Sequence, residues 1–156
     1  MAIGYRDMRF SGVSPSTAAG YSAALKVFLG YSAFEAACGA AGRDHNAVTS
    51  VRPGLGRALR AVGAGADDGE FPLAHTLKSS TLKSKISTTV RGESADVVPI
   101  AAAIRHLVAH GVFTVHGGKA DTNRAVSALW ALGDDMLQLS ESILESYLAE
   151  KLAVRQ

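Results

Sequence analysis

Residues 100–112 read IAAAIRHLVAHGV, and the rest of the chain is organised around this stretch, which places an arginine and two histidines at the end of an otherwise apolar helix. At helical periodicity, Arg105 and His110 lie on opposite flanks of an apolar stripe, and His106 points away from it. The stripe predicts a core-facing side made of Val97, Ile100, Ile104, Leu107, Val108 and Gly111.

The ends of this helix follow from capping chemistry. Asp96 is expected to open it, and Pro99 is tolerated in the first turn. The helix is expected to end at His110, because Gly111 supplies a left-handed residue and Val112 can fold back onto the last turn. His110 then lies where free carbonyls and the negative end of the helix dipole attract a positive charge.

Composition indicates one domain. The chain has 156 residues, 47% of them hydrophobic, with a net charge of +2 and a pI near 8.8, which permits a nucleic-acid partner without demanding one. Residues 1–13 are expected to form a flexible arm, and residues 14–156 a single helical domain. Cys38 is the only cysteine and no stretch has the length of a membrane span, so a cytoplasmic protein without a membrane anchor is expected.

The first helix is expected from about Thr17 to Ala40, after a hydroxyl-rich entry at residues 14–17. A helix that is apolar on two faces must be buried on both, inside one domain or between two protomers. Small residues at positions 23 and 30 would allow close backbone approach, which favours a dimer contact on the second stripe. The main stripe is Tyr21, Leu25, Phe28, Leu29, Ser32 and Ala36, and the second is Ala23, Val27, Gly30, Phe34 and Cys38.

Glu35 lies at the edge of the main stripe. An acid at such a position is a solvated flank, a partner for a neighbouring arginine, or a catalytic group. If Glu35 forms a buried pair with Arg105 across the helices, loss of the carboxylate should cost several kcal/mol.

The middle of the chain carries weaker patterns. Residues 42–69 are rich in glycine and predict one small helix with Val51, Leu55, Leu59 and Val62 on its apolar side. Residues 70–92 combine Ser and Thr with four cations, Lys78, Lys83, Lys85 and Arg91. They form either a basic strip that faces phosphates or a solvated helical hairpin, and the hairpin is favoured.

The last helix is expected to begin at a cap on Asp121 or Thr122 and to run to about Leu152. Its stripe is Ala125, Leu129, Leu132, Met136, Ser140, Ile143 and Tyr147, widened by Val126 and Leu144. The sequence therefore predicts an all-α bundle in which three longer helices, the first, the central and the last, pack around shorter elements.

The string Arg105-His106-Leu107-Val108-Ala109-His110-Gly111 resembles the signature of HEPN domains, which is an arginine, then a polar residue, then a histidine a few residues on. His106 stands where Asn is frequent. The surrounding order is similar too: an apolar first helix with an acid (YSAFEAA), the motif at the end of a later helix, and a long final helix ending in LSESILESYL. The resemblance covers about two thirds of the chain, and residues 42–92 carry nothing that matches it.

This resemblance implies a helical homodimer, often an RNA-cleaving toxin or antiviral effector, with a site that is built from both protomers and uses no metal or cofactor. Arg105 would hold the scissile phosphate, His110 would be the general acid or base, and His106 would orient them. Glu35 is a weaker catalytic candidate. An antitoxin protein, such as a small nucleotidyltransferase, is the partner expected for a toxin of this kind.

Two other function classes stay open. The first is a catalytically silent HEPN-like dimer that binds RNA or a protein, because the net charge is modest. The second is a metal site on His106 and His110, one turn apart, with His116 beyond. It is less favoured because the glutamate of the zincin pattern is missing.

Overall fold

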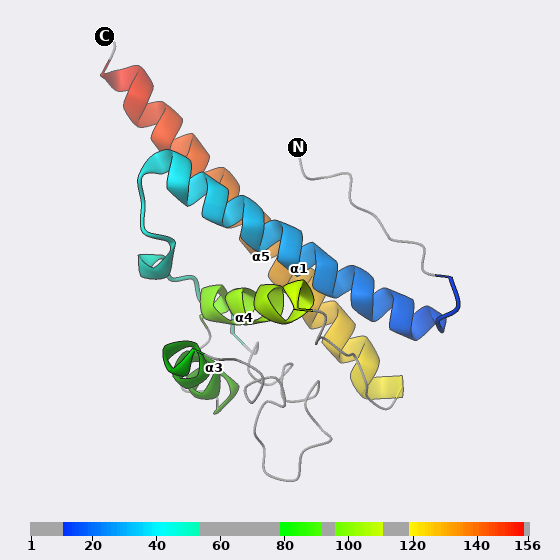
Figure 1. The fold of residues 1–156 in the computed structure, drawn as a ribbon. Helices are drawn as coiled ribbons and strands as arrows, with labels where there is room; N and C mark the ends of the chain where they lie inside the picture. The colour runs from blue at the N-terminus through cyan, green and yellow to red at the C-terminus, as the bar shows by residue number, and fades with distance from the viewer. Residues whose placement is uncertain (1–10, 54–78, 92–95, 111–118, 155–156) are drawn as a thin grey trace.

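The structure is a computed structural model that describes residues 11–53, 79–91, 96–110 and 119–154. α1 and α5 lie side by side, α4 crosses them, and α3 packs on α4 (Figure 1). The predicted all-α bundle is confirmed. Its described elements are α1 (Pro15–Ala41), the single-turn 3-10 helix η1 (His45–Ala47), α3 (Ser80–Arg91), α4 (Val97–Ala109) and α5 (Lys119–Ala153).

Capping sets both ends of α1. The Thr17 N–H donates to Ser14 Oγ at 3.2 Å, which caps the first turn. At the other end Gly42 adopts a left-handed φ of 67°, and the Arg43 N–H donates to the Cys38 carbonyl at 2.9 Å. These caps make α1 slightly longer at each end than predicted.

α1 and α5 run in the same direction. Lys26, in the first half of α1, pairs with Asp134, while Arg43, just after α1, reaches Glu150 with an Nη2 to Oε1 distance of 3.5 Å. Because the partners advance together along both helices, the packing is parallel (Figure 1). α5 packs along nearly the whole length of α1.

The closest approach of these two helices is at Gly30 and Gly133. A Cβ atom on Gly30 would lie 2.9 Å from the Gly133 carbonyl oxygen and 3.1 Å from Met136 Cβ. The second stripe of α1 is therefore covered by α5 and α4 of the same chain. The expectation that this stripe forms the contact between protomers is wrong, because the small residues bring α5 close instead.

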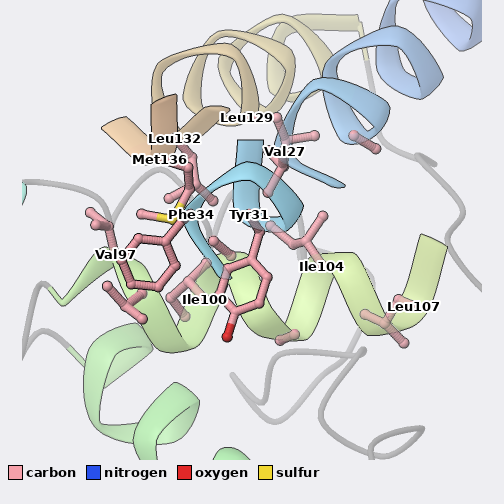
Figure 2. Close-up of a cluster of buried hydrophobic side chains, with 14 of the residues drawn as sticks. Val27, Tyr31, Phe34, Val97, Ile100, Ile104, Leu107, Leu129, Leu132 and Met136 are labelled. Atoms are coloured by element: carbon pink, nitrogen blue, oxygen red, sulfur yellow. The ribbon is translucent and has the colours of Figure 1, made fainter. Parts of the chain in front are cut away.

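The core lies between α1, α4 and α5 (Figure 2). The predicted core stripe of α4 is confirmed from Val97 to Leu107, and that of α5 from Leu129 to Ile143. Val108 is partly buried against the core, and Gly111 lies outside the described residues. Leu144 is exposed and does not widen the α5 stripe, although its neighbour Ile143 is buried. Fully buried side chains from the three helices include Val27, Phe34, Ile100, Ile104, Leu132 and Met136.

The main predicted stripe of α1 forms the outer face of the helix, with Leu29 45% exposed. Only two side chains of α1 are charged, Lys26 and Glu35, and neither lies in that stripe. We call Tyr21, Leu25, Phe28, Leu29, Ser32 and Ala36 the outer face of α1. This face is apolar, but it does not face the core, although the sequence analysis took it as the main stripe of the helix.

Other boundaries differ from the prediction or lie outside the described residues. α5 begins at Lys119, so Asp121 and Thr122 are inside the helix and do not cap it. Val51 is exposed and forms an isolated bridge with Asp96, not the side of a small helix. The arm at residues 1–10 and the segment 54–78 are not described, and residues 79–91 form only one helix of the predicted hairpin. None of the helices in the described part could span a membrane.

Candidate functional site

Arg105 of α4 and Glu35 of α1 meet where these helices pack. The apolar stripe of α4 lies on α1, which turns the flank that carries Arg105 toward the end of α1. Phe34 points into the core, so its neighbour Glu35 is left at the edge of the contact. Arg105 Nη2 is 3.2 Å from Glu35 Oε2, and the two residues form an ion pair.

His45 approaches the same carboxylate from the turn after α1. The Asn46 N–H donates to Asp44 Oδ1 at 2.9 Å, which caps η1 and lowers the pKa of Asp44. His45 Nε2 lies 3.8 Å from Glu35 Oε1. Glu35 therefore stands between a guanidinium on one carboxylate oxygen and an imidazole on the other.

Tyr31 lies one helical turn before Glu35 and supports the arginine. The Arg105 guanidinium carbon is 6.0 Å from the centre of the Tyr31 ring, within the range of a cation–π contact. Burial, and secondly the Glu35 charge, raise the pKa of Tyr31 to about 12, against an opposing effect of Arg105. The Tyr31 hydroxyl is therefore neutral at physiological pH. In Figure 2 its oxygen is directed away from α5.

His106 and His110 form a second group at the end of α4. Their ring centres are 4.4 Å apart and the rings are inclined at 57°. The His110 N–H donates to the His106 carbonyl at 3.1 Å, and α4 ends at Ala109 with His110 as its cap. The predicted end of this helix is confirmed, although Gly111 and Val112 lie outside the described residues.

The group formed by Arg105, Glu35 and His45 is open to solvent. The side chains of Arg105, His45 and Glu35 are 41%, 36% and 29% exposed. Arg105 Nε is buried and, among the described residues, has no hydrogen-bond partner. A guanidinium has several N–H donors, so Arg105 can bind a second anion without releasing Glu35. We call Glu35, His45 and Arg105 the polar patch.

A metal-binding cluster is not found in the part of the chain that the structure describes, where no three His, Cys, Asp or Glu side chains come together. His116, the third ligand in the metal hypothesis, lies outside that part.

The structure brings Glu35 to Arg105 and His106 to His110, and these are the four predicted site residues. It adds Tyr31 and His45, which the sequence analysis missed. The signal for Tyr31 is its spacing of four from Glu35 in YSAFE, which places both on one side of α1. The signal for His45 is the polar turn Asp44-His45-Asn46 directly after the Gly42 cap.

A comparison of the chain with protein-family models, curated proteins and solved structures found no match. The function is therefore argued from the chemistry of the site.

Proposed function

We propose that the chain is an HEPN-like, metal-independent RNA endonuclease that acts as a homodimer. The observation that carries the proposal is the contact of Glu35 on α1 with Arg105 on α4, on the helix that ends in His106 and His110. A guanidinium, a carboxylate and imidazoles in accessible positions are the groups that cleavage through a 2′,3′-cyclic phosphate needs.

Each residue has a role in this reaction. Arg105 binds the scissile phosphate through its planar set of donors, and Glu35 and Tyr31 hold the guanidinium in place. His110 gives a proton to the leaving 5′-oxygen, and the adjacent His106 ring orients it. The ribose 2′-oxygen is the nucleophile, so no bound water or metal has to supply one.

The outer face of α1 supports the homodimer. It is uncharged and partly exposed, and a second copy of the chain would bury it. Arg105 and His110 lie on opposite flanks of α4, so the composite site of this proposal pairs the arginine of one chain with the histidine of the other. A cytoplasmic toxin or antiviral effector, with an antitoxin such as a small nucleotidyltransferase, is the biological setting that fits this activity.

The alternative is a catalytically silent HEPN-like dimer that binds RNA or a protein. The modest net charge of +2 favours this alternative, because tight RNA binding usually involves more positive charge.

The test is RNA cleavage in excess EDTA by wild type, Arg105→Ala and His110→Ala. Loss of a proton-transfer group lowers the rate by about a hundredfold to ten-thousandfold, and loss of Arg105 should be comparable. Arg43→Ala is the matched control, since Arg43 is also 41% exposed and paired with a glutamate, but on α5. Products should end in 2′,3′-cyclic phosphate, and light scattering should give twice the 16.2 kDa of one chain.

Circular dichroism checks that each variant is folded. Equal cleavage by wild type, Arg105→Ala and His110→Ala would reveal a contaminating nuclease. The absence of cleavage by wild type would favour the silent dimer, and a mass of one chain would remove the composite site.

A further inference from the structure

We infer that His45 is a further catalytic residue, whose imidazole takes the proton of the attacking ribose 2′-hydroxyl while Glu35 orients it. The inference rests on the proposed function, in which Arg105 binds the phosphate and His110 is the acid but no base is assigned. His45 belongs to η1, far along the chain from the arginine and histidine motif of α4.

The carboxylate of Glu35 connects the two ends of the polar patch. Its Oε2 is 3.2 Å from Arg105 Nη2, and its Oε1 is 3.8 Å from His45 Nε2. A phosphate bound by Arg105 therefore brings its neighbouring ribose close to His45. All three side chains come from one protomer and are partly exposed, so the base and the phosphate-binding arginine need no second chain.

The orientation of the ring favours a base over a simple cation. Nε2 faces the carboxylate, so a proton on Nε2 is stabilised there and Nδ1 keeps a free lone pair for the substrate. At 3.8 Å this contact is longer than a hydrogen bond, and such contacts commonly tighten when the substrate binds. Arg105 engages the other oxygen of Glu35, which leaves the carboxylate in an orienting role.

The groups around Glu35 and His45 leave His45 as the main proton-transfer group of the polar patch. Burial raises the pKa of Tyr31 and of the Cys38 thiol, so both stay neutral at physiological pH. Asp44, whose pKa is lowered chiefly by hydrogen bonds from Asn46, stays ionised next to the imidazole. Among the described residues, the titratable and charged groups near Glu35 and His45 come from three places. Tyr31 and Cys38 are on α1, Arg43 and Asp44 are in the turn after it, and Arg105 is on α4. Lys85 on α3 also acts on Asp44.

The step balances. The 2′-hydroxyl proton moves to His45 Nδ1 as the 2′-oxygen forms its bond to phosphorus. The bond from phosphorus to the 5′-oxygen breaks, and the 5′-oxygen takes a proton from His110. The products are a 2′,3′-cyclic phosphate and a 5′-hydroxyl, and exchange of one proton with water returns both histidines to their starting forms.

The experiment compares His45→Gln with wild type on two RNA oligonucleotides, one with the natural 5′-oxygen and one with sulfur in its place at the cleaved bond. Sulfur leaves without protonation, so it removes the need for an acid but not for a base. His45→Gln should lower cleavage of both by about a hundredfold or more, whereas His110→Ala should be impaired only on the oxygen substrate. Ala47→Gln, two residues on in η1, is the matched control and should cleave both like wild type.

Two further readouts separate catalysis from structure. His45→Gln should bind a non-cleavable 2′-deoxy analogue as wild type does, and the rising limb of the kcat/KM profile with pH should disappear. Wild-type rates for His45→Gln on both substrates, while Arg105→Ala is inactive and His110→Ala is impaired on the oxygen substrate, would overturn the role of His45 alone. Rescue of His45→Gln by the sulfur substrate would also overturn it, since His45 would then be an acid. Wild type that cleaves neither RNA would overturn this inference together with the proposed function.

Discussion

Phe34 and Glu35 are neighbours in the chain, but they belong to two regions with different physics. Phe34 lies in the seam between α1 and α5, which also contains Gly30, Gly133 and Met136, and its side chain is fully buried (Figure 2). Glu35 lies in the polar patch, where it contacts Arg105 and His45 across partly exposed surfaces. One turn of a single helix thus serves both regions.

The difference between the seam and the polar patch separates stability from chemistry. Burial of apolar surface and close packing stabilise the seam, and any change of volume there is costly. The ion pairs of the patch remain in contact with water, which screens them, so their contribution to stability is small. Residues of the patch can therefore be replaced to test function without unfolding the protein.

The largest expected effect is that of Phe34→Ala, which should lower the free energy of unfolding by about 3–5 kcal/mol because it leaves a cavity in the seam. Urea denaturation followed by circular dichroism measures this loss. Phe28→Ala is the matched control, since Phe28 lies on the outer face of α1 and is only partly buried. A loss of less than about 1 kcal/mol for Phe34→Ala would contradict the seam as the core.

The second prediction concerns the two glycines of the seam. Gly30→Ala should cost about 1–3 kcal/mol, because the new Cβ would lie 2.9 Å from a backbone oxygen that cannot move aside. Gly133→Ala should cost less, because its closest neighbour is a side-chain atom, Lys26 Cγ at 2.8 Å, which a change of rotamer can shift, while the nearest backbone atom, the Lys26 carbonyl carbon, is 3.3 Å away. Thermal unfolding of both variants shows which one loses more stability. A larger loss for Gly133→Ala would show that the tightest contact between α1 and α5 is not at Gly30.

The smallest effect is expected for Glu35→Ala. The sequence predicted a cost of several kcal/mol for a buried pair, but the pair is partly exposed, so we expect a loss below about 1 kcal/mol. Glu145→Ala, an exposed acid on α5, is the control for loss of one negative charge. Melting temperatures at low and high salt measure the effect, and a loss that salt does not weaken would indicate that water is excluded from the patch.

Local signals predicted the helices well. Asp96 caps α4, with its Oδ1 3.2 Å from the Val98 N–H, and His110 ends the helix as expected. Ser14 and Gly42 set the ends of α1 in the same way. Capping involves residues within a turn of each other, so it can be predicted from a short stretch of sequence. The predicted beginning of α5 was wrong. Asp121 and Thr122 are residue types that often cap helices, but here the helix already begins before them, at Lys119.

The face of α1 that turns inward could not be predicted, because both of its stripes are apolar and both fit helical periodicity. The fit of Gly30 against Gly133 decides it, and these two residues are far apart along the chain.

By itself the sequence determined the all-α class, the span of α4 and the presence of Arg105, His106 and His110 at its end, since helical periodicity and capping act over a few residues. The contact of Glu35 with Arg105, and the approach of His45 to both, became visible only in the folded chain. These contacts depend on how α4 crosses α1 and on where the turn after Gly42 leads the chain. Both depend on packing between segments that no local pattern relates.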